Sequence, residues 1–248
     1  MIWLRSALFN GLFYATTAIM FLLFLPFLVA PRGAVLWLAR VWARLELWLL
    51  RVVAGLDTQF EGSPPEGPAI LALKHQSAWE TVLIGLMARD VTVVVKRELM
   101  WIPLYGWYLA RTGAIPVNRN AGASALRDLL RRAQAATQRQ RVILIFPEGT
   151  RTAPGEQRPY HPGIAALYTA LQVPVVPVAL NSGWFWGRRT FLRRPGRLTI
   201  RYLPAIPPGL ERHAFQARLA QELEAGVAAL APTAKAAPDG HLPRKVYT

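Results

Sequence analysis

The segment AILALKHQSAWET (residues 69–81) contains a strand pattern followed directly by a helix pattern. Ala69–Leu73 is a short, wholly apolar run, which is typical of a strand buried on both faces of a sheet. Helical periodicity occupies Ala78–Ala88, and Ser77 is a good N-cap for that helix. A buried strand that passes into a helix is the repeating unit of an α/β layer with a parallel sheet.

The same alternation extends along the chain on both sides of this segment. Further runs with strand character are Val91–Val95, Ala114–Val117, Val142–Phe146, Val173–Leu180 and Arg197–Leu203. Helical periodicity lies over Ser124–Gln138 and Leu210–Leu230. The sequence therefore predicts one α/β domain over residues 56–230, with a largely parallel sheet flanked by helices. Residues 231–248, rich in Ala and Pro, are expected to form a flexible tail.

Residues 1–55 differ from this domain in their hydropathy. No charged residue occurs between Arg5 and Arg32, and a helix over the apolar core of that run would be ~35 Å long, enough to cross a ~30 Å hydrocarbon layer. A cleaved signal peptide is the alternative, but the run is longer than a signal core and lacks a suitable cleavage site. Pro26 and the break at Pro31–Gly33 leave open whether the segment spans the bilayer or forms a hairpin in one leaflet.

A second helix is predicted over Ala34–Ala54. It combines tryptophan and leucine with three arginines, Arg40, Arg44 and Arg51, that fall within a ~40° sector of the helix. Arginine beside tryptophan is typical of a helix at the membrane interface, where guanidinium groups meet phosphates and indole rings lie at headgroup depth. A buried core helix with one exposed edge is the alternative. On either interpretation, residues 1–55 are predicted to be a membrane-anchoring segment of two helices.

The charge balance indicates an anionic partner. The chain carries 29 Lys and Arg against 14 Asp and Glu, a formal net charge of +15. Membrane lipid, an acidic substrate or carrier, and nucleic acid all fit such an excess. The sequence contains no recognised nucleic-acid-binding module, so lipid is the favoured partner. Cysteine is absent and the four histidines are far apart in the sequence, so no thiol nucleophile, disulfide or metal site is expected.

His75 and Glu80 lie where the quoted strand passes into its helix. On a regular helix residues five apart point ~140° away from each other. The two side chains can therefore meet only if His75 lies in the turn and Glu80 in the first turn of the helix. A carboxylate held against one imidazole nitrogen fixes the tautomer and leaves the other nitrogen as a general base. The same spacing also occurs for purely structural reasons, so this pair alone does not decide the function.

Cations follow several of the predicted strands. Arg151 ends the segment FPEGTR (residues 146–151), and Arg119 and Lys96 follow two other strands. Because the carboxyl ends of parallel strands meet at one edge of the sheet, these cations are expected to form an anion site, most simply for a phosphate monoester. A solvated arginine in an ordinary turn is the alternative at each position. A further aromatic and basic segment, residues 184–194, is expected to be a loop that faces the membrane or an anion.

Four blocks of sequence resemble a known family in their order and approximate spacing. They are His75-x4-Glu80, GAIPVNR (residues 113–119), FPEGTR (residues 146–151) and VPVVPVAL (residues 173–180). These blocks resemble the four motifs of the glycerolipid acyltransferases, in particular the bacterial 1-acylglycerol-3-phosphate (lysophosphatidate) acyltransferases. The segment KRELMWIPLYGW (residues 96–107) is similar to the same family. Two positions depart from its pattern: Glu80 replaces the usual Asp, and Lys74 replaces a frequent Asn.

The resemblance implies a single acyltransferase domain that needs no cofactor or metal. It would transfer an acyl group from acyl-CoA or acyl carrier protein to the sn-2 hydroxyl of 1-acyl-sn-glycerol-3-phosphate, giving phosphatidate. His75 would be the general base and Glu80 its orienting carboxylate. The acceptor would be bound by Lys96, Arg119, Glu148, Gly149, Thr150 and Arg151.

The resemblance also implies a location, the inner membrane of a bacterium with the active site on the cytoplasmic face. Two alternatives stay open at this point. One is the same chemistry on another lyso-lipid, such as lyso-ornithine lipid. The other, from a different class, is a basic, membrane-tethered nucleic-acid-binding protein.

Overall fold

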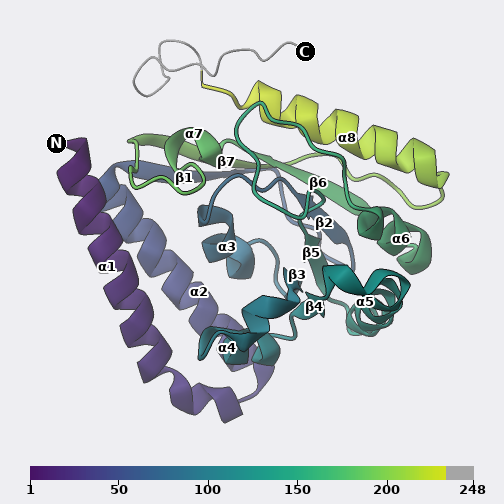
Figure 1. Ribbon diagram of the computed structural model, residues 1–248, viewed down its shortest axis with the longest axis horizontal. Helices are drawn as coiled ribbons and strands as arrows, with labels where there is room; N and C mark the ends of the chain where they lie inside the picture. Colours follow the sequence, from purple (N-terminus) through teal and green to yellow (C-terminus); the bar gives the residue numbers. More distant parts are fainter. Residues whose placement is uncertain (233–248) are drawn as a thin grey trace.

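The computed structural model describes residues 1–232, so nearly all of the predicted tail lies outside the described residues. A seven-stranded sheet crosses the molecule and has helices on both faces (Figure 1). The strand order is β1-β7-β6-β2-β5-β3-β4. Every neighbouring pair is parallel except β6 and β7, which are antiparallel. The predicted α/β class with a largely parallel sheet is confirmed.

The central strand β2 (Ile70–Leu73) begins the strand-to-helix segment of residues 69–81. It pairs with β5 on one side and β6 on the other, and all of its residues are buried. Leu71 and Leu73 point to one face of the sheet, whereas Ile70 and Ala72 point to the other, as the two-residue period of a strand requires. The strands are β1 (Leu56–Glu61), β2 (Ile70–Leu73), β3 (Val91–Lys96), β4 (Ile115–Val117), β5 (Val142–Ile145), β6 (Val175–Leu180) and β7 (Gly196–Tyr202).

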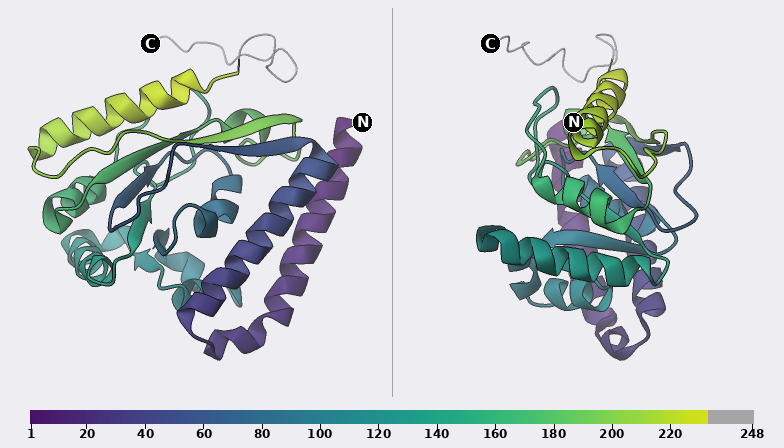
Figure 2. Two further views of the ribbon diagram at one scale, coloured as in Figure 1. Left: turned by 180° about the vertical axis from the view of Figure 1, so that it is seen from behind. Right: turned by 90° about the vertical axis from the view of Figure 1, so that its right-hand side faces the viewer.

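The helices divide between the two faces, and Figure 2 shows the resulting layers from two further sides. One face is covered by α5 (Gly122–Thr137), α6 (Pro162–Leu171) and α8 (Arg212–Ala229). The other face is covered by α1 (Ile2–Leu23), α2 (Arg32–Leu49), α3 (Trp79–Leu83) and α4 (Tyr105–Arg111). The short helix α7 (Ser182–Phe185) follows β6.

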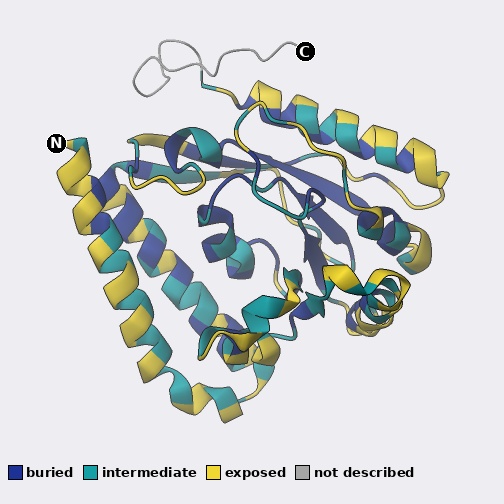
Figure 3. Cartoon of the chain, in the orientation of Figure 1, coloured by how far each residue is buried: buried dark blue, intermediate teal, exposed yellow. Residues whose placement is uncertain are grey.

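The helices α1 and α2 form an antiparallel hairpin at one end of the molecule. Among the described helices, α1 alone is long and apolar enough to cross a membrane, and most of its residues are exposed or half-buried (Figure 3). The inner side of the hairpin nevertheless belongs to the core of the domain, because Phe9, Leu49 and Leu50 are buried in the same cluster as the strands. Residues 1–55, called the leader below, and the sheet therefore share one hydrophobic core.

The exposed side of α2 agrees in part with the predicted basic stripe. Arg44 and Arg51 are exposed, as are Trp37 and Trp48. Arg40 instead turns inward, where its Nε donates to the carbonyl of Gly85 at 3.0 Å. The prediction that Arg40 lies on the outer stripe is therefore corrected.

The structure also differs from the predicted elements. The strand β1 was not predicted, because it is an edge strand whose single buried residue, Leu56, leaves no clear apolar pattern. The helix predicted over Ala78–Ala88 ends as an α-helix at Leu83 and continues only as a 3₁₀ turn. The helix α6 is an addition to the predicted set.

Candidate active site

His75 lies in the turn between β2 and α3, at the carboxyl edge of the sheet. Its Nδ1 is 3.1 Å from Oε2 of Glu80, which lies in the first turn of α3. The imidazole is 13% exposed, whereas the carboxylate is buried. The predicted meeting of the two side chains therefore occurs, and Nε2 remains as the ring nitrogen available to a substrate.

The Glu80 carboxylate is held in place by further hydrogen bonds. The backbone N–H of Ser77 donates to its two oxygens at 2.9 and 3.0 Å, while the Ser77 hydroxyl accepts from the N–H of Trp79 at 2.9 Å. This is a form of the capping box, in which an S-x-x-E sequence satisfies N–H groups at the start of a helix. The hydroxyl of Ser182, at the start of α7, also donates to Glu80. The carboxylate is thereby fixed beside His75 by the nearby Ser77 and by Ser182, which is 102 residues away in the chain.

The FPEGTR loop packs directly on the His75 turn. The backbone N–H of Thr152 donates to the carbonyl of His75 at 2.8 Å. The imidazole ring stacks on Phe146, with the two ring centroids 4.0 Å apart. The loop that follows β5 and the turn that follows β2 therefore hold each other in position.

Lys74 and Glu148 form a buried ion pair beneath this loop. The Nζ atom of Lys74 lies 2.7 Å from Glu148 and 2.6 Å from Glu224 of α8, and the Tyr160 hydroxyl donates to Glu224 at 3.0 Å. Burial raises the pKa of Glu148, and Lys74 partly offsets that rise. The Glu148 side chain is 0% exposed. Its carboxylate is thus engaged with Lys74 beneath the loop, and its part in binding the acceptor stays a prediction.

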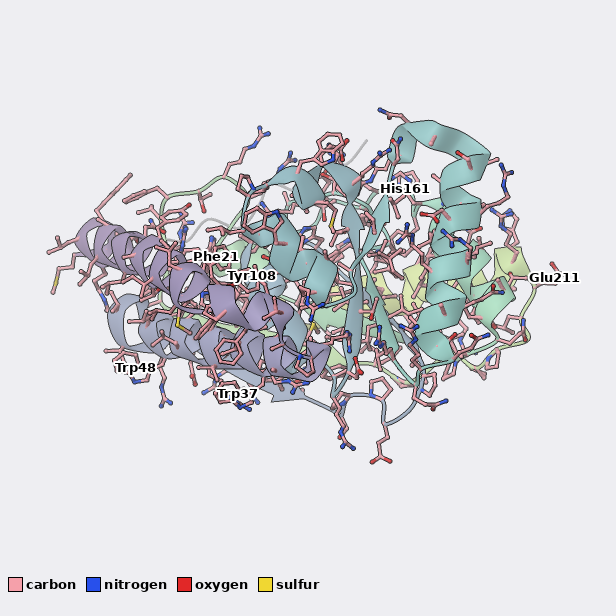
Figure 4. All side chains as sticks on the ribbon, turned by 90° about the horizontal axis from the view of Figure 1, so that it is seen from below. Phe21, Trp37, Trp48, Tyr108, His161 and Glu211 are labelled. Atoms are coloured by element: carbon pink, nitrogen blue, oxygen red, sulfur yellow. The ribbon has the colours of Figure 1, made fainter. Side chains whose placement is uncertain are left out.

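Gly149, Arg119 and His161 meet on the outer side of the same loop. Gly149 has a φ of +64°, and a Cβ there would lie 2.5 Å from a ring carbon of His161 and 3.5 Å from Cζ of Arg119. Only glycine allows both this backbone conformation and this close approach. His161 is exposed at the start of α6 (Figure 4). No local motif connects His161 to Gly149, so nothing in the sequence alone points to this contact.

Arg151 and Lys96 differ in the partners of their side chains. The Nε atom of Arg151 is buried and lacks a hydrogen-bond partner among the described residues. Tyr105 lies near it, since burial raises the pKa of the Tyr105 phenol and the Arg151 guanidinium partly offsets that rise. A buried donor without a partner favours an anionic ligand at this point. Lys96 is exposed and pairs with Glu98 at 3.6 Å, so it lies at the same edge but has a partner of its own.

An apolar cavity of about 140 Å³ lies beside the His75 turn, between the leader hairpin, α3 and α4. Thr81 and Val82, which directly follow Glu80, line it from α3. Phe21 of α1 and Tyr108 of α4 also line it, and their rings stack with centroids 5.3 Å apart (Figure 4). The His75–Glu80 pair thus has an apolar cavity close by in addition to the cations at the sheet edge.

Residues 184–194 are buried only in part, since Phe191 is 46% exposed and stacks on Trp3 of α1, and their predicted contact with the membrane or an anion stays a prediction. Phe185 and Trp186 are buried, and Trp186 packs edge-on against Phe9 of α1. Arg193 is also buried, with its guanidinium 4.1 Å from the centroid of the Trp186 ring. This segment therefore joins the leader to the sheet.

The fold places the His75–Glu80 pair at the carboxyl edge of a largely parallel sheet, with arginines and an apolar cavity nearby, which is the arrangement of an α/β enzyme. The chain belongs to the acyltransferase family, whose sequence model matches residues 57–181. It is 34% identical, over 82% of its length and 81% of the relative, to a 1-acyl-sn-glycerol-3-phosphate acyltransferase of Pseudomonas aeruginosa. A relative with the same description from Limnanthes alba is 30% identical over 65% of this chain and 57% of its own.

A solved structure has the same fold. The crystal structure of the 1-acyl-sn-glycerophosphate acyltransferase PlsC from Thermotoga maritima superposes with a TM-score of 0.75. The match covers 94% of this chain and 100% of that one, at 20% sequence identity. The resemblance found in the sequence blocks is thereby confirmed at the level of family and fold.

Proposed function

We propose that the protein transfers an acyl group from an acyl thioester to the sn-2 hydroxyl of 1-acyl-sn-glycerol-3-phosphate, forming phosphatidate. The observation that carries this proposal is the His75–Glu80 pair, 3.1 Å apart, beside both the arginine-lined edge and the apolar cavity. The similarity to the Pseudomonas enzyme along most of both chains supports it.

The geometry supports a direct transfer with His75 as general base. Nε2 of His75 takes the proton of the sn-2 hydroxyl as its oxygen attacks the thioester carbonyl. The tetrahedral intermediate then collapses, the carbon–sulfur bond breaks, and the imidazolium returns the proton to the departing thiolate. Glu80, held by Ser77 and Ser182, keeps the imidazole in its tautomer and stabilises the imidazolium.

The acceptor phosphate is assigned to the edge formed by the second and third sequence blocks. The unpartnered Nε of Arg151 and the exposed guanidinium of Arg119 supply the charge. Gly149 lets the loop backbone approach the ligand, and Thr150, half-buried in the same loop, offers a hydroxyl. Lys96 contributes at longer range, since it already pairs with Glu98.

The apolar cavity beside α3 is assigned to an acyl chain. A chain that enters past Thr81 would leave its thioester or ester end beside His75. Residues 1–55 then act as the membrane anchor that brings the cavity to the lipid, with residues 56–230 as the catalytic domain. The donor is acyl-CoA or acyl carrier protein, and the place is the inner membrane of a bacterium, on its cytoplasmic face.

A lyso-lipid without a phosphate is the competing acceptor. Lyso-ornithine lipid would enter the same apolar cavity and present a hydroxyl to the same base. Its ornithine head group offers a single carboxylate beside an ammonium, whereas a phosphate monoester brings more negative charge to the unpartnered Nε of Arg151, which favours the phosphate-bearing acceptor.

The test is an assay of the purified full chain with a labelled acyl thioester and a panel of acceptors. The panel contains 1-acylglycerol-3-phosphate, its dephosphorylated monoacylglycerol, and lyso-ornithine lipid, each offered with acyl-CoA and with acyl carrier protein. We expect labelled phosphatidate to be the main product. A faster transfer to lyso-ornithine lipid would overturn the choice of acceptor, and no transfer to any lipid would overturn the proposal.

A further inference from the structure

A basic cavity, distinct from the apolar one, lies at the opposite edge of the sheet from His75. Its volume is about 500 Å³. Its charged lining consists of Arg32, Arg40, Arg89, Arg139 and Arg141, together with Glu66 and Asp90. We call it the Arg32 pocket. It carries a net charge of +3, so an anion is the ligand that its lining fits.

The Arg32 pocket is distinct from the acceptor site. Arg89 and Arg141 precede the first residues of β3 and β5, whereas His75 and Gly149 follow the last residues of β2 and β5. The two sites are therefore separated by the length of the strands, on the order of 13–20 Å. One phosphate cannot serve both.

The arginines of this pocket are incompletely neutralised. The side chains of Arg89 and Arg139 are exposed and form no hydrogen bond or ion pair within residues 1–232. The Nε of Arg141 is buried without a hydrogen-bond partner there, and its nearest carboxylate oxygen, on Asp90, is 3.8 Å away. Burial and the nearby Arg32 charge lower the pKa of Arg141. A bound anion would relieve both the missing hydrogen bond and the repulsion.

The other two arginines of the pocket, Arg32 and Arg40, are held in fixed positions. Arg32 donates to the carbonyls of Thr112 and Val91 at 2.8 and 2.9 Å and pairs with Asp90. Arg40 donates to the carbonyl of Gly85 at 3.0 Å. Both side chains are held in place by backbone groups, so ordering them costs little when a ligand binds.

The surroundings of the pocket indicate a membrane lipid. Trp37 is 54% exposed and lies on α2 between Gly33 and Arg40, which both line the pocket. Figure 4 shows Trp37 and Trp48 together on one side of the molecule, with His161 on the other. Leu36 lines both the Arg32 pocket and the apolar cavity. An exposed indole on the same helix and apolar surface beside the cations match a ligand whose phosphate is attached to hydrocarbon chains.

We propose that the Arg32 pocket binds the phosphate head group of an anionic phospholipid of the surrounding membrane. Arg89, Arg139 and Arg141 contact the phosphate, with Trp37 at headgroup depth. This goes beyond the proposed acyl transfer, because it concerns a lipid that is bound and not converted. It makes attachment of the leader to the membrane depend on the kind of lipid present as well as on apolar contact.

The test measures binding of short-chain lipids to the detergent-purified full chain. Dihexanoyl phosphatidylglycerol is titrated, with dihexanoyl phosphatidylcholine and glycerol 3-phosphate as comparisons at the same ionic strength. We expect phosphatidylglycerol to bind most tightly. The variant Arg89→Gln/Arg139→Gln should weaken that binding at least about tenfold, since it removes two charge-assisted contacts. Both side chains are exposed, and the single variant Arg139→Gln serves if the double variant fails to fold.

Two control variants make the result specific. Arg212→Gln/Arg218→Gln removes two charges from α8, on the other face of the sheet, and should change binding less than twofold. Arg151→Ala removes the proposed acceptor contact and should also leave phosphatidylglycerol binding within twofold, so that the two sites are told apart. Equal weakening by the pocket and α8 variants would overturn the proposal, as would loss of binding in Arg151→Ala alone. Equally tight binding of glycerol 3-phosphate that is weakened by Arg89→Gln/Arg139→Gln and kept in Arg151→Ala would exclude the membrane as the source of the ligand.

Discussion

Glu80 combines two tasks that usually belong to different residues. It accepts from the backbone N–H of Ser77 at the start of α3, and it holds His75 at 3.1 Å. Glu80→Gln keeps an oxygen for the Ser77 N–H, so the helix start should survive while the negative charge beside His75 is lost. We expect turnover to fall by about 10²–10⁴, less than or equal to the loss for a triad carboxylate. Steady-state rates measure the loss of turnover, and circular dichroism of the same samples shows whether the helices are retained.

Two further variants separate the effect of the Glu80 charge from the effect of its side-chain length. Glu80→Asp restores the residue usual in the family but shortens the arm by one methylene, so partial activity is expected. His75→Ala/Glu80→Gln should be little slower than His75→Ala alone, because the two residues act as a unit. A folded Glu80→Gln protein with near-normal rates would reduce Glu80 to a helix-capping residue.

Arg151 is the residue on which the choice of acceptor depends. Arg151→Lys keeps the charge but loses the planar fork, so use of lysophosphatidate should weaken, and Arg151→Ala should weaken it further, by roughly 10–100-fold in kcat/KM. The same variants assayed on monoacylglycerol should change little, because that acceptor carries no phosphate. If kcat/KM fell equally for both acceptors, the phosphate contact would have to be assigned to another residue.

At the residue scale, the sequence could predict what is local. His75 and Glu80 are close along the chain, and the turn between them follows from one strand, one cap and one helix. Ser182 and His161 reach the site only through the packing of β6 and the FPEGTR loop, and nothing in their own neighbourhoods marks them. The burial of Glu148 was missed for the same reason, since its second neighbour, Glu224, lies on α8.

At the element scale, β2, the FPEGTR loop and α8 are joined by the Lys74 ion pairs. Lys74→Met keeps most of the side-chain volume but leaves the buried Glu148 and the half-buried Glu224 without their cation. Breaking a buried pair in this way is expected to lower the free energy of unfolding by about 3–5 kcal/mol. Arg218→Ala breaks the exposed Arg218–Glu222 pair of α8 and should cost at most ~0.5 kcal/mol. Chemical denaturation of both variants is the measurement, and equal small losses would contradict the role given to Lys74.

The strands that are buried at every residue were predictable, whereas the mixed edge strand β1 and the partly buried helix α6 were not. The central strands β2 and β5 are buried at every residue and appear in the sequence as unbroken apolar runs. The edge strand β1 is stabilised by pairing with β7, which is more than a hundred residues away in the chain, and its own composition is mixed. The early end of α3 is likewise decided by its neighbours, since Gly85 packs against Arg40 and Ala39 of α2.

At the scale of the whole molecule, residues 1–55 share one hydrophobic core with the sheet and so belong to the same folded unit. Phe9 packs against Trp186, and Ser6 accepts a hydrogen bond from the backbone of Arg193 at 2.9 Å. Removing residues 1–54 would expose this apolar surface. We expect the remaining chain to be insoluble or to unfold without cooperativity, as measured by thermal denaturation and dye binding. A soluble remainder that melts cooperatively and stays active on bilayers would show that the leader is dispensable.

The central claim is that His75 is the base of a direct acyl transfer to a lysophosphatidate hydroxyl. The most direct measurement is the rate of labelled phosphatidate formation by the full-length His75→Ala protein, beside the wild type, in the same bilayers. The thermal midpoint of each sample shows whether the fold is retained. We predict that phosphatidate formation falls to background in a variant that remains folded. Phosphatidate formation by folded His75→Ala at a rate near that of the wild type would contradict the account.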